Sequence, residues 1–171
     1  MKKLLLTGIL VLLFSCKPTD VTIIVTVDTQ ELYNSDSQGE EATHKYTALT
    51  DDYKDRLPKK GIKYFRSKVW KGHHVTWVGV SESPEYTVAI DAIEMTSPNN
   101  KDPDKNSKRY ANFFDTQIIP GRGGKHSIVR AKIRSDLEYL RYYYTIKYSI
   151  HKEEGNDNKP YQIDPKLKAY H

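Results

Sequence analysis

Hydrophobic and polar residues alternate along much of the chain, and this alternation predicts β-strands. The clearest example is the segment Leu140–Ile150. The residues expected on its apolar face are Leu140, Tyr142, Tyr144, Ile146, Tyr148 and Ile150. A period of two over eleven residues fits an extended strand, whereas a helix repeats about every 3.6 residues. We therefore predict a strand here, with its apolar face turned to a core.

Other segments rich in β-branched and aromatic residues have the same character. They are Val21–Val27, Tyr64–Trp70, Val75–Val80, Tyr86–Met95, Asn112–Ile119, Ile128–Arg134 and, as a closing strand, Tyr161–Ile163. Within the fourth of these we expect Tyr86, Val88, Ile90 and Ala92 to share one face. No segment after Cys16 shows a convincing helical stripe, apart from a single turn at Asp51–Leu57. The pattern predicts an all-β, single-domain fold: an antiparallel two-sheet β-sandwich of immunoglobulin or cupredoxin type.

The first sixteen residues have a different character. Met1-Lys2-Lys3 is basic, and residues 4–14 are apolar apart from Thr7 and Gly8. This order is typical of an export signal, and the apolar run is too short for a stable membrane-spanning helix. It ends in Leu13-Phe14-Ser15-Cys16, which resembles the lipobox of bacterial lipoproteins. An ordinary secretory signal, with the cysteine there by coincidence, is the alternative.

The lipoprotein resemblance implies cleavage before Cys16, diacylglycerol on its sulfur and acylation of the new amine, for example with palmitate. The predicted organisation is a signal peptide at 1–15, a lipidated cysteine and tether at 16–20, and a β-sandwich domain at 21–171. Several acyl chains anchor a protein stably where one does not. Because Lys17 rather than Asp follows the cysteine, we expect a lipid-anchored protein of the cell envelope, held at the outer membrane.

Charge and cysteine content exclude some functions. The 171 residues include 27 Lys+Arg and 22 Asp+Glu, a formal net charge of +5. Part of this charge belongs to the signal segment, since Lys2 and Lys3 leave with it, so nucleic acid is not an expected partner. Cys16 is the only cysteine, which excludes an internal disulfide and a Cys-rich metal site.

Three groups of short motifs resemble one protein family. The first strand ends in Val25-Thr26-Val27-Asp28-Thr29; residues 72–83 hold a Gly, a Val-x-Trp-x-Gly step and Ser-Glu-Ser; residues 143–150 are followed by Ile163-Asp164-Pro165-Lys166-Leu167. In order and spacing they resemble the inclusion body protein family, the PixA/AidA-type proteins, over nearly the whole mature domain. The resemblance implies a compact β-sandwich without a known catalytic site, linked with intracellular inclusions or with host-associated, density-regulated traits.

The chain departs from this family in two ways. Some relatives that form inclusions are rich in methionine, but this chain has only Met1 and Met95. A methionine store is therefore not expected. The lipobox would also remove the protein from the cytoplasm, where inclusions form.

Aromatic residues suggest one core position and one ligand surface. Trp77 follows a Gly turn inside a predicted strand, so we expect it to fill the space between two sheets. Tyr143, Trp70 and Tyr64 are candidates for an exposed surface on which a sugar ring would stack. Asp28, directly after a strand, is expected to cap a turn through its carboxylate.

Histidines suggest a metal site. His73, His74 and His126 would suit copper or zinc, since imidazole binds both. Adjacent strand residues point to opposite faces, so His73 and His74 would need a bulge, which Gly72 permits. Two solvent-facing histidines without metal are the alternative. A blue-copper centre is excluded, because it needs a cysteine thiolate and Cys16 is used for lipidation.

A basic stretch with no acidic residue covers Lys59, Lys60, Lys63, Arg66, Lys68 and Lys71, interleaved with Tyr64, Phe65 and Trp70. Such a strand would contact an anionic lipid surface. The alternative is an edge strand whose lysines discourage aggregation.

These observations favour a non-catalytic protein without a cofactor. The leading hypothesis is a lipid-anchored β-sandwich lipoprotein of the inclusion-body-protein type that self-associates or binds a host or envelope partner. The alternative is a glycan-binding or metal-binding module. An enzyme is disfavoured, because no Ser-His-Asp or paired-carboxylate set can be singled out from spacing.

Overall fold

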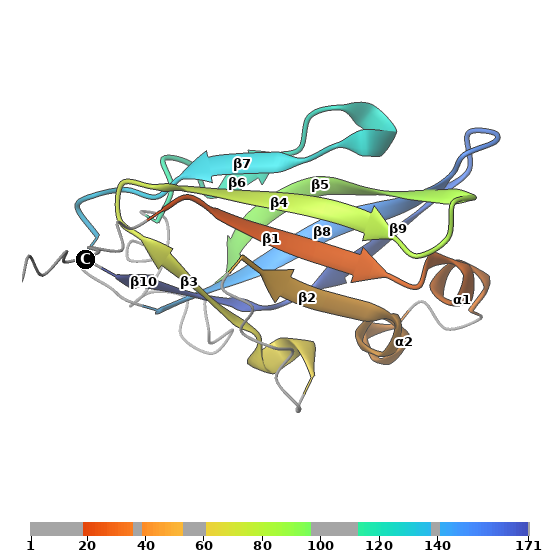
Figure 1. Ribbon diagram of the computed structural model, residues 1–171, viewed down its shortest axis with the longest axis horizontal. Coiled ribbons are helices and arrows are strands. Elements are labelled where there is room, and N and C mark those ends of the chain that lie inside the picture. Colours follow the sequence, from red (N-terminus) through yellow and green to blue (C-terminus); the bar gives the residue numbers. More distant parts are fainter. Residues whose placement is uncertain (1–18, 36–38, 53–60, 97–112, 138–140, 171) are drawn as a thin grey trace, which may run out of the picture.

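Two β-sheets pack face to face as a sandwich (Figure 1). The computed structural model describes residues 19–35, 39–52, 61–96, 113–137 and 141–170. Its elements are β1 (Val21–Val27), α1 (Thr29–Asn34), α2 (Glu40–Tyr46), β2 (Thr47–Asp51), the 3-10 turn η1 (Ile62–Tyr64), β3 (Arg66–Trp70), β4 (His74–Ser81), β5 (Tyr86–Thr96), β6 (Ile118–Pro120), the 3-10 turn η2 (Gly124–His126), β7 (Val129–Lys132), β8 (Arg141–Lys152), β9 (Asn158–Ile163) and β10 (Lys166–Tyr170). In this part of the chain, no helix has the length and apolar character needed to cross a membrane.

The predicted two-sheet sandwich is confirmed, with a mixed strand pairing. One sheet has the order β2-β1-β4-β7, and the other has the order β3-β10-β8-β5-β6, with β9 also paired to β8. Most pairs are antiparallel, but β1–β4 and β3–β10 are parallel. Each parallel pair joins strands far apart in the sequence, so the chain has room for the crossover that parallel strands need.

Most predicted strands are present, and two were missed. Residues Val21–Val27 form β1 as predicted, and β8 extends the predicted segment at its C-terminal end to Lys152. β6 is shorter than the predicted Asn112–Ile119, whose first residue lies outside the described part. The two additional strands, β2 and β10, have alternating inward and outward residues but are only five residues long.

Two short helices contradict the prediction of a chain without helices. They are α1 and α2, of six and seven residues. Less than two turns cannot display a periodic apolar stripe, which explains why the pattern missed them. The Asp28 carboxylate caps α1 by accepting a hydrogen bond from Glu31 N at 3.2 Å, as its position after β1 predicted. The helical turn predicted at Asp51–Leu57 starts at the end of β2 and lies mostly outside the described residues.

A β-bulge corrects the predicted face of β5. Tyr86, Val88 and Ile90 are buried as expected, but the register shifts between Ile90 and Ala92. The extra residue moves Ala92 off the buried face, and Ile93 and Met95 continue that face in its place. The bulged residue is Asp91, whose carboxylate receives a hydrogen bond from Ser149 Oγ of β8.

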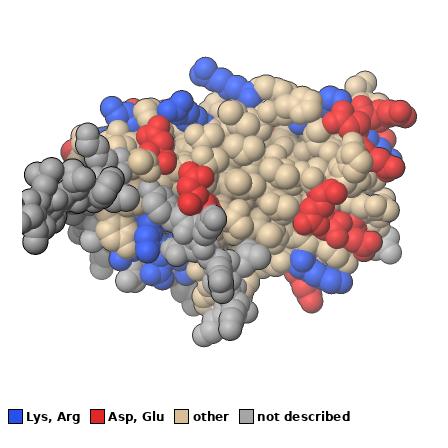
Figure 2. Space-filling view, viewed as in Figure 1, with Lys and Arg blue, Asp and Glu red and all other residues tan. Residues whose placement is uncertain are grey.

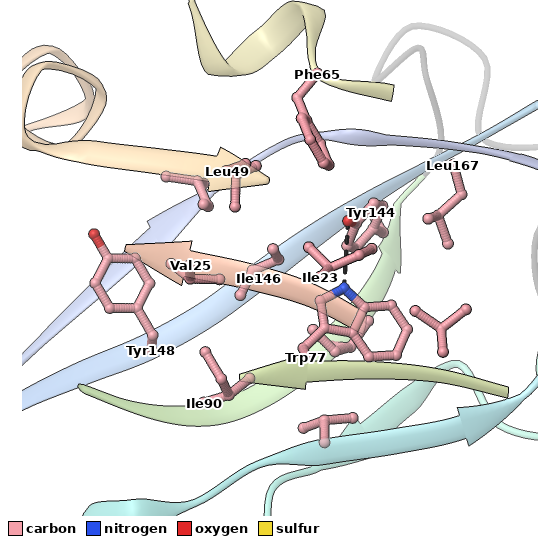
Figure 3. Close-up of a cluster of buried hydrophobic side chains, with 14 of the residues drawn as sticks. Ile23, Val25, Leu49, Phe65, Trp77, Ile90, Tyr144, Ile146, Tyr148 and Leu167 are labelled. Atoms are coloured by element: carbon pink, nitrogen blue, oxygen red, sulfur yellow. Dashed lines mark hydrogen bonds between the residues drawn. The ribbon is translucent and has the colours of Figure 1, made fainter. Parts of the chain in front are cut away.

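Trp77 lies between the two sheets, as predicted (Figure 3). Its side chain is 0% exposed and meets the rings of Phe114 and Tyr144 edge-on, at centroid distances of 5.9 and 5.8 Å. Its Nε1–H donates to Tyr144 Oη at 3.3 Å, which satisfies the one polar atom of the indole. This contact joins β4 of one sheet to β8 of the other.

Because two tyrosines are buried, we expect the protein to lose stability at alkaline pH. Burial raises the pKa of Tyr144 and of Tyr148 well above the usual value. A phenol whose pKa is higher in the folded than in the unfolded state makes its full contribution to stability below the unfolded-state pKa of about 10. This contribution decreases as the pH rises above that value. We expect the free energy of unfolding to drop above that pH by up to about 1.4 kcal/mol per pH unit for each phenol. Urea titrations at several alkaline pH values measure the slope. Tyr148→Phe should make the slope shallower than in the unaltered protein, and an equal slope in both proteins would contradict the assignment.

Candidate functional site

Asp20 directly precedes β1 and organises the end of the sandwich at which this strand begins. Its carboxylate accepts hydrogen bonds from His74 N at 2.8 Å and from Arg130 Nη2 at 3.0 Å. The Nδ1 atoms of His73 and His74 lie 3.7 and 3.5 Å from its two oxygens. The backbone N–H of His74, with smaller contributions from the His74 charge and from Arg130, lowers the pKa of Asp20. Hydrogen bonds from β4 and β7 thus hold Asp20 in place directly before β1.

The structure brings together two of the three predicted metal-site histidines. Gly72, at φ 79°, permits the tight turn before β4, and His73 and His74 then approach the same carboxylate despite being adjacent. His126 belongs to η2 and lies near Val78 and Gly79, at the far end of β4. Within the described residues, no group of three or more His, Cys, Asp or Glu side chains has the arrangement of a metal site. Metal binding at His73 and His74 stays a prediction.

Two of the three predicted aromatic residues, Trp70 and Tyr143, lie on the outer side of the six-stranded sheet. β3 and β10 pair in parallel, with Arg66 beside Lys166, Lys68 beside Lys168 and Trp70 beside Tyr170. Their alternate residues, Ser67, Val69, Leu167 and Ala169, are buried, so the paired residues face outward, and Trp70 is half-buried because it also packs against the edge of the core. We call this outward set, together with Tyr143 of β8, the basic–aromatic stripe. Tyr64 is 45% exposed but belongs to η1, before the stripe.

Cations and rings alternate within the stripe. The Trp70 and Tyr170 rings are 6.2 Å apart. Lys166 Nζ lies 5.0 Å from the centre of the Tyr143 ring, and Lys168 Nζ lies 4.6 Å from that of Tyr170. Sequence reasoning found the β3 half of the stripe and missed the β10 half. Lys166-Leu167-Lys168-Ala169-Tyr170 does alternate with a period of two, but five residues are too few to distinguish a strand from an irregular polar C-terminal segment.

The opposite side of the molecule carries an uncharged sheet face. Residues of β1, β2 and β4 that alternate with the core positions point outward here, and we call them the uncharged face: Thr22, Ile24, Thr26, Ala48, Thr50, Thr76, Val78 and Val80. Figure 2 shows a broad area over these strands without Lys, Arg, Asp or Glu, and charged side chains around its margin. Ile24 lies between Thr50 and Val78 in register, at the centre of the face.

A polar hollow of about 560 Å³ lies between α2, β5, β8 and β9. It is lined in part by Glu40, His44, Asp91 and Lys147. Near it, Ser149 Oγ donates to Asp91 Oδ1 at 3.0 Å and lies 2.8 Å from His151 Nε2. Burial is the main cause of the raised pKa of Asp91.

This Asp91–Ser149–His151 contact was not foreseen, because the bulge at Asp91 creates it. Its order differs from a catalytic triad, in which the histidine lies between serine and carboxylate. The serine has one proton and donates it to Asp91, so His151 donates to Ser149 instead of removing its proton. Ser149 is also only 6% exposed. The contact therefore gives hydrogen-bond partners to the hydroxyl of the buried Ser149.

Comparison with known proteins gives a fold neighbour. No family model matches the sequence, and no curated protein matches it. The crystal structure of the inclusion body protein PixA from Burkholderia cenocepacia J2315 superposes with a TM-score of 0.55 and 10% sequence identity, covering 92% of this chain and 99% of that chain. This chain has the fold of PixA. At that identity the likeness shows the fold alone.

A second solved structure overlaps much less. The bradyzoite-specific antigen BSR4 from Toxoplasma gondii gives a TM-score of 0.30 and 6% identity, over 68% of this chain and 46% of that chain. An overlap of this size does not indicate a shared fold. The PixA superposition agrees with the β-sandwich that the motif resemblance implied. The motif residues Asp28 and Trp77 serve this fold, as a helix cap and as a core side chain.

Proposed function

We propose that this chain is a lipid-anchored protein of the cell envelope that acts without catalysis, by association of its β-sandwich domains through the uncharged face. The uncharged face is the observation that carries the proposal. A sheet face exposed to water usually bears charged and strongly polar side chains. Here the outward residues of three adjacent strands are Thr, Ile, Val and Ala, apart from His74 at the start of β4. A broad exposed area of this composition is typical of an interaction surface.

The size of the face predicts weak association in solution. β1 spans seven residues and three strands contribute, so two copies packed face to face would bury on the order of 1,000 Å². Interfaces of that size belong to the lower end of specific complexes. Anchoring would compensate, because lipid attachment confines many copies to one surface and raises their effective concentration.

The predicted anchor and the fold neighbour support this function. Cys16 stands only four residues before Asp20, whose contacts hold the start of the domain, so a lipid on Cys16 would keep the domain close to the membrane. PixA is described as an inclusion body protein. For this chain we propose association on a membrane surface rather than a cytoplasmic inclusion.

The structure favours this function over glycan binding. A sugar ring stacks on an open aromatic face. One face of Tyr143 is covered by Lys166 Nζ, and one face of Tyr170 is covered by Lys168 Nζ. A glycan would have to displace these cations, whereas the uncharged face needs no rearrangement before a second copy packs on it.

A charge at the centre of the uncharged face should prevent association. In a symmetric pair the lysines of an Ile24→Lys variant would approach each other, and we expect the dissociation constant of the dimer to rise at least about tenfold. Size-exclusion chromatography with light scattering measures the change on the chain from residue 16 onward. Ile118→Lys is the matched control, because Ile118 is 53% exposed on the other sheet. Equal dissociation constants for both variants would contradict the proposal.

A further inference from the structure

We propose that the basic–aromatic stripe is a second membrane contact, through which the domain rests on anionic lipid headgroups beside its anchor. The stripe consists of Arg66, Lys68 and Trp70 on β3, Lys166, Lys168 and Tyr170 on β10, and Tyr143 on β8. This inference rests on the proposed anchor at Cys16. It does not depend on self-association, since the stripe and the uncharged face belong to different sheets.

The charge arrangement points to an external anion. The register places Arg66 beside Lys166 and Lys68 beside Lys168 on strands about 4.8 Å apart. Like charges at such positions repel each other. Arg66, Lys166 and Lys168 form no ion pair with a described residue, while Lys125, Arg130, Arg134 and Lys147 each pair with a described carboxylate. A layer of phosphate groups would neutralise the charges of Arg66, Lys166 and Lys168 together.

The aromatic end of the stripe suits the boundary between headgroups and acyl chains. Trp70 and Tyr170 are neighbours at the ends of their strands, and their rings are 6.2 Å apart. Trp and Tyr are enriched at this depth of a bilayer because their rings are apolar and carry one polar group. Each Lys or Arg near an anionic surface adds about fivefold to binding. The stripe therefore combines both kinds of membrane-interface residue on one outward surface.

Hydrogen bonds connect the stripe to the end of the sandwich at which Asp20 precedes β1. Lys71 N donates to Tyr170 O at 3.0 Å, and Gly72 N donates to Ile133 O at 2.9 Å. Ile133 N donates to His73 O at 2.8 Å, and His74 N donates to the Asp20 carboxylate. This band of contacts crosses the end of the sandwich at which β1 begins and both β3 and β10 end (Figure 1).

The tether is too short to keep this end away from a membrane. Only three residues separate Cys16 from Asp20, and no conformation can place the Cα atoms of these two residues more than about 14 Å apart. The stripe itself is about 13 Å long, since β3 and β10 have five residues each. An anchor on Cys16 thus brings the stripe within reach of headgroups, and contact there leaves the uncharged face open.

Vesicle binding tests the charges. The chain from residue 16 to 171, without acyl chains, contains the whole hydrophobic core, which begins at Val21. We expect it to cosediment with vesicles of phosphatidylcholine and phosphatidylglycerol and not with phosphatidylcholine alone. The triple variant R66Q/K166Q/K168Q should bind the anionic vesicles about 100-fold more weakly. The control K45Q/R122Q/K125Q removes the same charge from α2 and the η2 region and should bind within about twofold of the unaltered chain.

Tryptophan fluorescence tests the geometry. The chain has two tryptophans, and Trp77 is fully buried, so surface quenching reports on Trp70. With the chain coupled through its only cysteine, Cys16, to maleimide lipid in anionic vesicles, nitroxide headgroup lipids should quench Trp70 emission. Trp70→Phe should remove the quenched component.

The outcomes separate this inference from the proposed function. Equal vesicle binding by the two triple variants, an unquenched Trp70, or preference for a soluble polyanion such as DNA over vesicles would each overturn it. None of these results concerns natural lipidation or dimer formation. Conversely, absence of natural lipidation would refute the anchor while leaving the charge-dependent binding in place.

Discussion

Replacing Cys16 with serine is expected to move the protein from the membrane fraction to the soluble fraction. Serine has no thiol to receive diacylglycerol, and cleavage before residue 16 depends on that modification in the predicted pathway. Since each buried CH₂ of an acyl chain contributes about 0.8 kcal/mol, loss of two or three chains should lower membrane partitioning at least about a thousandfold. Incorporation of radiolabelled palmitate in cells measures the modification. Detergent phase partitioning measures membrane affinity, in high salt so that the charges of the stripe are screened.

A conservative change beside the cysteine is the control for this experiment. Ser15→Ala keeps a small residue before Cys16 and should preserve both labelling and the membrane fraction. If the unaltered protein carries no palmitate and partitions as the Cys16→Ser protein does, the segment is an ordinary secretory signal. The lipid anchor would then be wrong, although the β-sandwich and its two surfaces would not change.

Trp77→Ala is expected to cause the largest loss of stability of any single change in the described core. The side chain is 0% exposed and contacts Phe114, Tyr144 and both sheets. Removing an indole of this kind leaves a cavity, and the free energy of unfolding should fall by about 3–5 kcal/mol. The loss also leaves Tyr144 Oη without the N–H that now reaches it.

Urea unfolding followed by circular dichroism measures this loss. Trp70→Ala is the matched control, because Trp70 is only half-buried at the edge of the core. It should cost clearly less than Trp77→Ala. Losses of equal size in the two variants would contradict the placement of Trp77 as the main contact between the sheets.

Alternation of inward and outward residues over long segments allowed much of the fold to be predicted. In β1 buried and partly exposed residues alternate over all seven positions. In β8 the predicted inward residues Tyr144, Ile146, Tyr148 and Ile150 are buried, and Thr145 and Ser149 of the opposite face are buried as well. Shorter elements failed for a physical reason. β2 and β10 have five residues and α1 has six, so each offers two or three inward side chains, too few to define a period. The bulge at Asp91 shifted the pattern of β5 and could not be read from composition.

The candidate surfaces were predictable only in part, because both depend on strand pairing. The basic residues of β3 were visible as a run, but their partners Lys166 and Lys168 lie about a hundred residues away and meet them only through the parallel register. The uncharged face likewise combines β1, β2 and β4. His73, His74 and Asp20 meet because the turn at Gly72 is tight. Sequence spacing gives none of these juxtapositions.

The central claim is that the domains associate through the uncharged face, and sedimentation equilibrium of the chain from residue 17 to 171 over a wide concentration range tests it most directly. We predict a reversible, concentration-dependent equilibrium between monomer and a defined oligomer, weak in solution because the face is small. A monomer at every concentration would contradict intrinsic self-association.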